Sequence, residues 1–426
     1  MIDVKLIREQ PNLVKEGIRK KGTDPSIIDK FLELDLKKRR LLQEIENIRA
    51  KKNAAEKKMS LAGNKEAILE ALKEAKAFLT EKGEELEAIE REWKDSLSLI
   101  PNLPLTSVPE GKDESENIVL REEGVKPVFN FIPKDYLTLA EELDIIDTKR
   151  AAKTSGSRFG FLKREAALLE SALLCFLFEK LIKKGFTPII PPVLIKHFPF
   201  WGMGYLDRGK EEVYFLEKDE LYLIGTAEQI IGSMHLDETF EKEELPKRYL
   251  GFSSCFRREA GSYGKDTKGI LRVHQFDKAE MFSFSRPEDS QKEHEFLLSL
   301  EEEIMKNLGI PYRVLLICSG DLGDPAAAKY DIEAWLPGQN NGKGEYRETH
   351  STSNCTDFQA RRLNIKFKNE KGGKEYVHTL NGTALAMGRA IIAIIENYQT
   401  KEGKIKIPKV LWRYTGGIKI IPSLKR

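Results

Sequence analysis

Two arginines and a glutamate stand side by side in FRREAGSYGKD, residues 256–266. In a strand, residues two apart share a face, so Arg257 and Glu259 would point one way and Arg258 the other. The planar guanidinium of arginine suits phosphate or carboxylate, and a glutamate accepts hydrogen bonds from an amino group. One face could therefore hold a molecule that carries both groups, such as ATP. A solvated surface strand is the alternative interpretation.

The stretch ILRVHQFDKAEMF, residues 270–282, would bring the chain back beside this strand. A period of two places Arg272, His274, Phe276, Lys278 and Glu280 on one face. An arginine, an aromatic ring and a glutamate on the same face favour a ligand site. A solvated strand with a phenylalanine packed below it remains the simpler alternative.

Two further segments could contribute to such a site. Residues 384–395 are apolar on all sides and predict a buried helix, with Arg389 in its middle. An unpaired buried charge is costly, so Arg389 needs either a structural carboxylate or an anionic ligand such as a nucleotide. Glu348 and Ser351 lie close together in YRETHSTSN, and their oxygens suit Mg²⁺ shared with phosphates, although such hydroxyl-rich stretches are common.

Several other classes of protein are disfavoured. GSYGKD lacks the spacing of a phosphate-binding P-loop, and HEFLL lacks the second histidine of a zinc protease motif. The four cysteines are far apart, so we expect free cytosolic thiols and no zinc site. No signal peptide or long uncharged apolar run is visible, and the net charge is +2. We therefore expect a cytoplasmic protein without membrane contact.

The first hundred residues carry two heptad stripes separated by a break at residues 60–64. This pattern predicts an antiparallel coiled-coil arm over about residues 27–97, within an N-terminal domain of residues 1–100. Its first helix is basic and its second acidic, which fits charge complementarity between paired helices. A second interpretation, compatible with the first, is a basic edge that binds phosphates. The candidate contacts are Lys37, Lys38, Arg39, Arg40, Lys51 and Lys52.

The rest of the chain lacks heptad spacing and has a mixed pattern of strand-like and helix-like runs. Residues 101–117 are rich in proline and predict a linker. From residue 118 to 426, strand-like runs follow one another without regular βαβ alternation, which predicts an α+β domain with an antiparallel sheet and helices. An apolar helix and a proline-rich strand at 161–192 suit a sheet edge or an interface.

Together these segments resemble a known family, the class II aminoacyl-tRNA synthetases, and within it the bacterial-type seryl-tRNA synthetases. The resemblance covers nearly the whole chain and includes the heptad arm. The other stretches that carry it are MIDVKLIREQPNLVKEGIRKKG, TAEQ, FRREAGSYGKDTKGILRVHQFDKAEMF, SNCTDFQARR, NGTALAMGR and IPKVLWRYTGG. It implies ATP-dependent activation of L-serine to seryl-adenylate and transfer of serine to the 3′ end of tRNA(Ser), with tRNA(Sec) as an open second acceptor. It further implies a class II catalytic domain, Mg²⁺, no zinc, and a homodimer formed through residues 161–192.

The resemblance also implies roles by position. Arg257 would bridge the serine carboxylate and the ATP α-phosphate, Glu259 would bind the adenine amino group, and Arg389 would complete the catalytic set. The implied ATP-binding residues are Arg257, Arg258, Glu259, Arg272, Val273, Phe276, Glu348, Thr349, His350, Ser351 and Arg389, with Mg²⁺ on Glu348 and Ser351. The implied L-serine-binding residues are Thr226, Ala227, Glu228, Arg257, Glu280, Asn381 and Thr383.

Two stretches depart from the family pattern. FWGMGYLDRG, residues 200–209, stands where a TGxLPKF-like stretch is usual. Thr349-His350-Ser351-Thr352 stands where the family usually has Ser-Ser-Cys, and His350 could either pack or contact the nucleotide. Two other functions stay open: an amino acid:carrier-protein ligase, whose relatives lack a full coiled-coil arm, and a non-enzymatic scaffold, which would have lost active-site residues.

Overall fold

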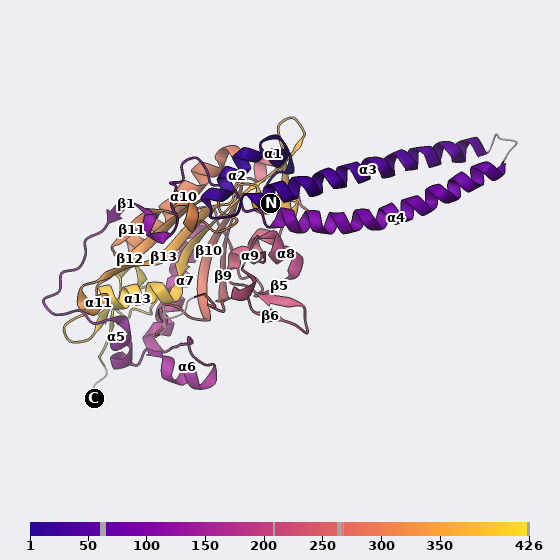
Figure 1. Cartoon of the computed structure of the whole chain (residues 1–426). Coiled ribbons are helices and arrows are strands. Elements are labelled where there is room, and N and C mark those ends of the chain that lie inside the picture. The colour runs from indigo at the N-terminus through magenta and orange to yellow at the C-terminus, as the bar shows by residue number, and fades with distance from the viewer. Residues whose placement is uncertain (60–64, 208, 262–265, 267, 424–426) are drawn as a thin grey trace. The chain divides into compact units, whose positions relative to one another are not determined.

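The computed structural model describes residues 1–59, 65–207, 209–261, 266 and 268–423. The chain divides into two compact units, Met1–Leu103 and Pro104–Arg426 (Figure 1). Among the described residues, no helix combines the length and the apolar character that a membrane span requires.

Unit 1 is helical. It consists of α1 (Val4–Glu9), α2 (Pro11–Lys20), α3 (Ser26–Met59) and α4 (Lys65–Ser98). The two long helices, α3 and α4, lie side by side along their length (Figure 1). Heptad residues such as Phe31, Leu41 and Ile45 are buried between them, so the expected helix pair is confirmed. The expected break at residues 60–64 lies outside the described residues.

A buried carboxylate, Asp35, ties the base of the helix pair together. Arg8 donates to it at 2.7 and 2.8 Å, Arg39 at 2.9 Å and the Trp93 indole N–H at 3.1 Å. Burial would raise the pKa of Asp35, but the hydrogen bonds from Arg8 and Trp93 lower it, so the carboxylate is ionised. The contacts join α1, α3 and α4.

Unit 2 is built on one main sheet with the strand order β1-β11-β12-β13-β16-β10-β9-β4. Neighbouring strands are antiparallel except for β4 and β9, which are parallel, so the predicted α+β domain with an antiparallel sheet is confirmed. The strands are β1 (Ile118–Glu123), β4 (Thr187–Ile189), β9 (Lys247–Phe256), β10 (Gln275–Ser285), β11 (Tyr312–Leu316), β12 (Ala328–Leu336), β13 (Glu345–Asn354) and β16 (His378–Ala386).

Three apolar helices share a continuous core with this sheet: α7 (Arg164–Ile182), α10 (Ser290–Leu308) and α13 (Met387–Asn397). The α10 helix packs on β13 and β16, and α13 packs on β10 and β12. The remaining helices are α5 (Tyr136–Leu143), α6 (Thr148–Thr154), α8 (His197–Gly202), α9 (Ala227–Ser233), α11 (Gln339–Gly342) and α12 (Phe358–Leu363).

Small sheets surround the main one. They are formed by β2 (Ile146–Asp147) with β3 (Phe161–Leu162), by β5 (Leu194–Lys196), β7 (Leu221–Leu223) and β6 (Phe215–Leu216), by β8 (Thr239–Phe240), β14 (Lys366–Lys368) and β15 (Lys374–Tyr376), and by β17 (Ile405–Lys406) with β18 (Ile420–Ile421). The sheet of β5, β6 and β7 leads directly into α9, which packs against β9 and β10 and so brings residues 226–228 to the main sheet.

Candidate active site

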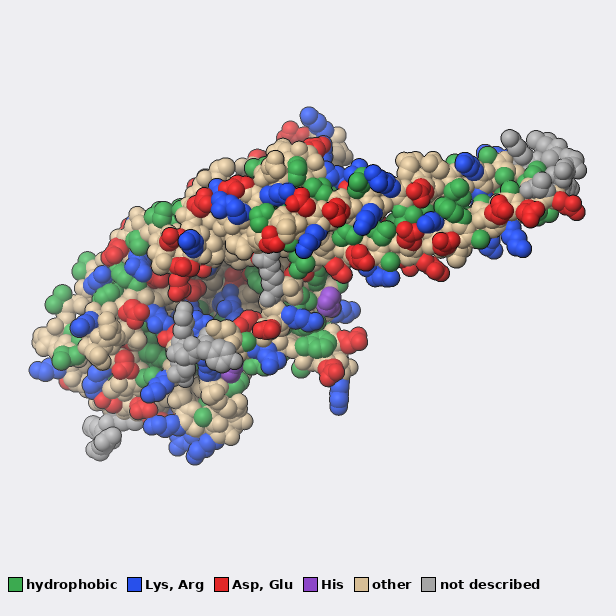
Figure 2. Space-filling model, viewed as in Figure 1, with side chains coloured by type: hydrophobic (Ala, Val, Ile, Leu, Met, Phe, Trp, Pro, Cys, Tyr) green, Lys and Arg blue, Asp and Glu red, His purple; other side chains and the backbone are tan. Residues whose placement is uncertain are grey.

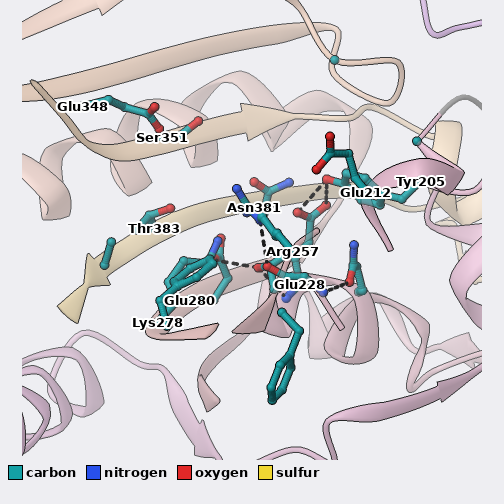
Figure 3. Close-up of a pocket in the computed structure, with 18 of the residues that line it drawn as sticks. Tyr205, Glu212, Glu228, Arg257, Lys278, Glu280, Glu348, Ser351, Asn381 and Thr383 are labelled. Atoms are coloured by element: carbon teal, nitrogen blue, oxygen red, sulfur yellow. Dashed lines mark hydrogen bonds and ion pairs between the residues drawn. The ribbon is translucent and has the colours of Figure 1, made fainter. Parts of the chain in front are cut away.

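A cavity of about 710 Å³ lies against the main sheet of unit 2. Strands β10, β12, β13 and β16, the start of α9, the start of α13 and the segment 205–213 all contribute to its lining. It brings together most of the residues singled out from the sequence: Thr226, Glu228, Arg257, Glu259, Arg272, Val273, Phe276, Glu280, Glu348, Thr349, Ser351, Asn381, Thr383 and Arg389. Figure 3 shows how several of these side chains converge.

Three of the expected site residues do not line this cavity. Ala227 is buried in the apolar cluster of α9, and the Arg258 guanidinium lies 5.8 Å from the centre of the Tyr214 ring. His350 is buried, its Nδ1 lies 2.8 Å from the Thr349 hydroxyl, and burial lowers its pKa to about 4. Of the two interpretations of His350, this placement favours packing over contact with a nucleotide.

A β-bulge explains how Glu348 and Ser351 share a face although they are three residues apart. Opposite β12, Ile332 pairs with His350 and Glu333 pairs with Glu348, so Thr349 is the extra residue. The extra residue resets the alternation, which turns His350 away and returns Ser351 to the cavity. Strict alternation would have placed Glu348 with His350.

One end of the cavity is rich in arginine. Arg272 donates to Glu259 at 2.7 Å, and Arg389 forms an ion pair with Glu348 at 3.3 Å. The Arg257 guanidinium lies 5.2 Å from the centre of the Phe276 ring. The expected buried helix over residues 384–395 is wrong at its start, because β16 continues to Ala386 and Arg389 lies in the first turn of α13 with its side chain 26% exposed. The ion pair with Glu348 holds Arg389 where it lines the cavity.

The carboxylate of Glu348 is the best candidate to hold a metal ion. Its side chain is 48% exposed, facing the open cavity. Partial burial would raise its pKa, but Arg389 and Lys329 lower the pKa to about 2, so the group is ionised. Ser351 adds a hydroxyl on the same face. Among the described residues, no group of three or more His, Cys, Asp or Glu side chains could hold a metal by itself.

The other end of the cavity carries two buried glutamates, Glu228 and Glu280. The Tyr205 hydroxyl donates to both Glu228 oxygens, at 2.9 and 2.8 Å, and the Gln359 amide donates at 3.1 Å. Burial and the neighbouring charge of Glu280 raise the pKa of Glu228 to about 7. Glu280 accepts from the Thr226 hydroxyl at 3.1 Å and forms an ion pair with Lys278 (Figure 3).

The atypical stretch at 200–209 forms part of the wall at this end. Its Tyr205 holds Glu228, and its Asp207 forms a buried ion pair with Arg362 at 2.6 Å. The Arg362 guanidinium also lies over the rings of Trp201 and Phe358. The departure from the family pattern therefore comes with its own packing partners in α12.

Sequence reasoning did not assign a site role to four residues that touch this region: Tyr205, Gln359, Lys278 and Lys329. Lys278 was on the correct strand face, and Lys329 lines the cavity beside Asp331, at 3.0 Å. Tyr205 and Gln359 come from separate segments, so only the fold could bring them to Glu228.

In unit 1, three of the expected basic contacts form ion pairs within the helical arm, one of them between Lys52 and Glu56 at 3.2 Å. Lys38 pairs with Glu90 of α4 at 3.1 Å and lies over the Trp93 ring, while Arg39 is bound to Asp35. Acidic and basic side chains are interspersed along the helix pair in the view of Figure 2. Exposed basic residues of α3 include Lys37, Arg40 and Lys51.

Arg257 and Glu259 do not lie on a strand as expected, because β9 ends at Phe256 and Glu259 has a positive φ of 53°. The antiparallel sheet, the segment after β9 that carries Arg257 and Glu259, and the helix that carries Arg389 together define the catalytic domain of a class II aminoacyl-tRNA synthetase. The family model described as tRNA synthetase class II core domain (G, H, P, S and T) matches residues 214–398. The model described as Seryl-tRNA synthetase N-terminal domain matches residues 1–104. The chain belongs to the seryl-tRNA synthetase family.

Individual relatives agree over the full length of the chain. The serine--tRNA ligase of Dictyoglomus turgidum is 46% identical over 428 residues, which covers 99% of this chain and 100% of the relative. The crystal structure of seryl-tRNA synthetase from Pyrococcus horikoshii complexed with ATP is 42% identical, covers 100% of both chains and superposes with a TM-score of 0.93. The cytoplasmic serine-tRNA ligase from Naegleria fowleri in complex with AMP is 34% identical, covers 100% of this chain and 99% of that one, and has a TM-score of 0.89.

Proposed function

We propose that this protein is a serine--tRNA ligase that activates L-serine with ATP and transfers it to tRNA(Ser). The observation that carries the proposal is the single cavity in which an arginine-rich end meets the buried pair Glu228 and Glu280. Such a cavity suits the simultaneous binding of a nucleotide and a small amino acid. Structural relatives in complex with ATP and AMP support the nucleotide assignment.

In the first step, an oxygen of the serine carboxylate bonds to the α-phosphorus of ATP, and the bond from that phosphorus to the pyrophosphate oxygen breaks. A carboxylate is already a nucleophile at neutral pH, so the reaction needs alignment and charge neutralisation but no general base. Arg257 would bridge the two reacting anions. Arg272 and Arg389 would neutralise the phosphates.

Nucleotide binding on this proposal exchanges contacts within the cavity. Glu259 would accept from the adenine amino group, and Phe276 and Arg389 would cover the two faces of the ring. The ion pairs of Arg272 with Glu259 and of Arg389 with Glu348 would then give way to contacts with ATP. Mg²⁺ held by Glu348 and Ser351 would supply further charge neutralisation on the phosphates, with most of its ligands coming from ATP and water.

Serine recognition would use the other end of the cavity. Glu228 and Thr226, with Glu280, are the proposed partners of the serine ammonium group. The serine hydroxyl would be read by Glu280, Asn381 and Thr383, and Thr383 lies directly opposite Glu280 in the β10–β16 register. Alanine lacks the hydroxyl group, so the polar groups of such a pocket would stay unpaired when alanine is bound. We therefore expect strong discrimination against alanine.

In the second step, the 3′-hydroxyl of tRNA would attack the carbonyl carbon of seryl-adenylate and release AMP. We propose that residues 1–100 bind the tRNA, that residues 101–117 are a linker, and that residues 118–426 catalyse both steps. Exposed basic residues of α3 are the proposed phosphate contacts, so deletion of residues 31–95 should cause a large, salt-sensitive loss of tRNA affinity while serine activation is retained. Unchanged affinity would refute the role of the arm. Charging of tRNA(Sec) is decided by the same assay with that transcript.

We further propose a cytoplasmic homodimer formed through residues 161–192. The strand β4 ends the main sheet and pairs with β9 on one side. Apolar side chains are exposed in this region, namely Phe161 (46%), Ile182 (48%) and Ile190 (76%). An exposed apolar edge of this kind is typical of a protein–protein interface.

Serine-dependent exchange between ATP and pyrophosphate tests the proposed function. Exchange with serine, followed by charging of tRNA(Ser), is the expected result. Exchange with a different amino acid would refute the specificity, and charging of a carrier protein would identify the ligase alternative. A chain that binds tRNA without any exchange would be a scaffold.

A further inference from the structure

Lys278 places an ammonium group inside the cavity, in the part where the serine ammonium group is proposed to bind. It is 8% exposed, lines the cavity and forms an ion pair with Glu280, which is 1% exposed. Both residues project from the same face of β10, two positions apart. A permanent cation close to the site of a cationic substrate group needs an explanation, because like charges in a buried site repel.

The two buried glutamates are held in different ways. Glu228 accepts from the neutral donors Tyr205 and Gln359, whereas Glu280 has a charged partner, Lys278. A substrate ammonium group would therefore supply the cation that Glu228 lacks. Glu280 already has its cation and is ready for a neutral group of the substrate.

The contacts of Glu280 also fix which oxygen faces the substrate. Within the described residues, both the Thr226 hydroxyl and the Lys278 ammonium group contact the same oxygen, Oε2. Oε1 is then the oxygen that a substrate hydroxyl would reach. An ionised carboxylate that is anchored at one oxygen is a strong and well-oriented hydrogen-bond acceptor at the other.

On the opposite face of the sheet, a third glutamate, Glu301, lies near the ion pair of Lys278 with Glu280. Asn381 and Thr383 line the cavity, so a side chain at Gly382, which lies between them on β16, would point to the opposite face of the sheet. On that face, Glu301 of α10 is fully buried. A Cβ at Gly382 would lie 3.0 Å from Glu301 Oε1, so the glycine leaves room for this carboxyl group. Burial, followed by the charges of Glu280 and Asp331, raises the pKa of Glu301 well above its usual range, so Glu301 is neutral and does not compete for Lys278.

We propose that Lys278 determines specificity for a hydroxylated amino acid, by anchoring the Glu280 carboxylate at Oε2 while Oε1 accepts the substrate hydroxyl. This inference rests on the proposed function. Lys278 acts through Glu280 and is a positioning residue. Without Lys278, the buried Glu280 would lose its charged partner and one of the two groups that anchor Oε2, so its acceptor oxygen would no longer be oriented.

The test compares serine with alanine as substrates of the full-length protein in ATP–pyrophosphate exchange. In Lys278→Met, kcat/KM for serine should fall about 100-fold while kcat/KM for alanine changes little, so the ratio of the two collapses. The ammonium and carboxylate groups are common to both amino acids, and their contacts cancel in this ratio. A loss that is equal for both substrates would overturn the proposal, since a purely structural role predicts that outcome.

Two further variants complete the design. Lys278→Arg should restore most of the serine-to-alanine ratio because it restores a cation, and Lys278→Gln, which carries a neutral donor, should not. The Gln variant decides the question if Lys278→Met does not fold, and a normal ratio in Lys278→Met or in Lys278→Gln would refute the inference. Lys247→Met is the matched control, because Lys247 lies on β9 outside the cavity lining and pairs with Glu244. Absence of serine-dependent exchange in the wild type would refute the proposed function itself.

Discussion

Lowering the pH from 8 to 6 should weaken serine binding, because Glu228 has to be ionised to hold the serine ammonium group. Burial and the charge of Glu280 raise the pKa of Glu228 to about 7. With that value, the ionised fraction falls from about 0.9 at pH 8 to about 0.1 at pH 6, so the apparent Kd for serine rises about tenfold. Bound serine favours the ionised form, and binding at pH 6 should release close to one proton per site.

Isothermal titration calorimetry of serine binding, in buffers of different ionisation enthalpy, measures both the apparent Kd and the number of protons released. Tyr205→Phe removes a hydroxyl group that donates to the Glu228 carboxylate. The variant should therefore shift the midpoint of the pH dependence upward, by about one unit for a hydrogen bond of ordinary strength. A serine affinity that is flat between pH 6 and 8, or proton uptake on binding, would refute the reasoning.

Three other perturbations have defined outcomes. Gly382→Ala places a Cβ 3.0 Å from Glu301 Oε1 and should destabilise the protein by about 1–3 kcal/mol in thermal unfolding while raising the KM for serine more than that for ATP; a variant as stable as wild type would contradict the packing described here. Asp35→Asn weakens the charged hydrogen bonds at the base of the helix pair and should cost about 1–2 kcal/mol, seen as faster hydrogen exchange in α3 and α4; unaltered exchange would contradict it. Ile190→Asp should convert the proposed dimer to a monomer in light scattering, and a persistent dimer would place the interface elsewhere.

The broad architecture was accessible from the sequence because it depends on periodicity. Heptad spacing around Phe31 and Leu41 determines which side of each long helix is apolar, and the helix pair follows from it. Alternation correctly grouped Phe276, Lys278 and Glu280 on one face of β10. It was wrong for Arg272 and His274, which precede the strand, and His274 does not line the cavity. These are local properties that a single segment contains.

The finer parts of the site depend on register and on distant segments. The bulge at Thr349 reverses the alternation in β13, so His350 faces away although alternation from Glu348 points it inward. Tyr205 and Gln359 reach Glu228 from positions 23 and 131 residues away. No local sequence pattern predicts these contacts with Glu228, because they depend on how whole helices and strands pack against each other.

The internal ion pairs of Arg272 with Glu259 and of Arg389 with Glu348 have a consequence for turnover. On the proposed function, a nucleotide that binds at the arginine-rich end would first have to separate these carboxylates from their guanidinium partners. After pyrophosphate has been released and serine has been transferred to tRNA, the two ion pairs can form again. Their formation would favour the dissociation of AMP. The internal ion pairs therefore lower the affinity for ATP and speed the release of AMP, which suits rapid turnover.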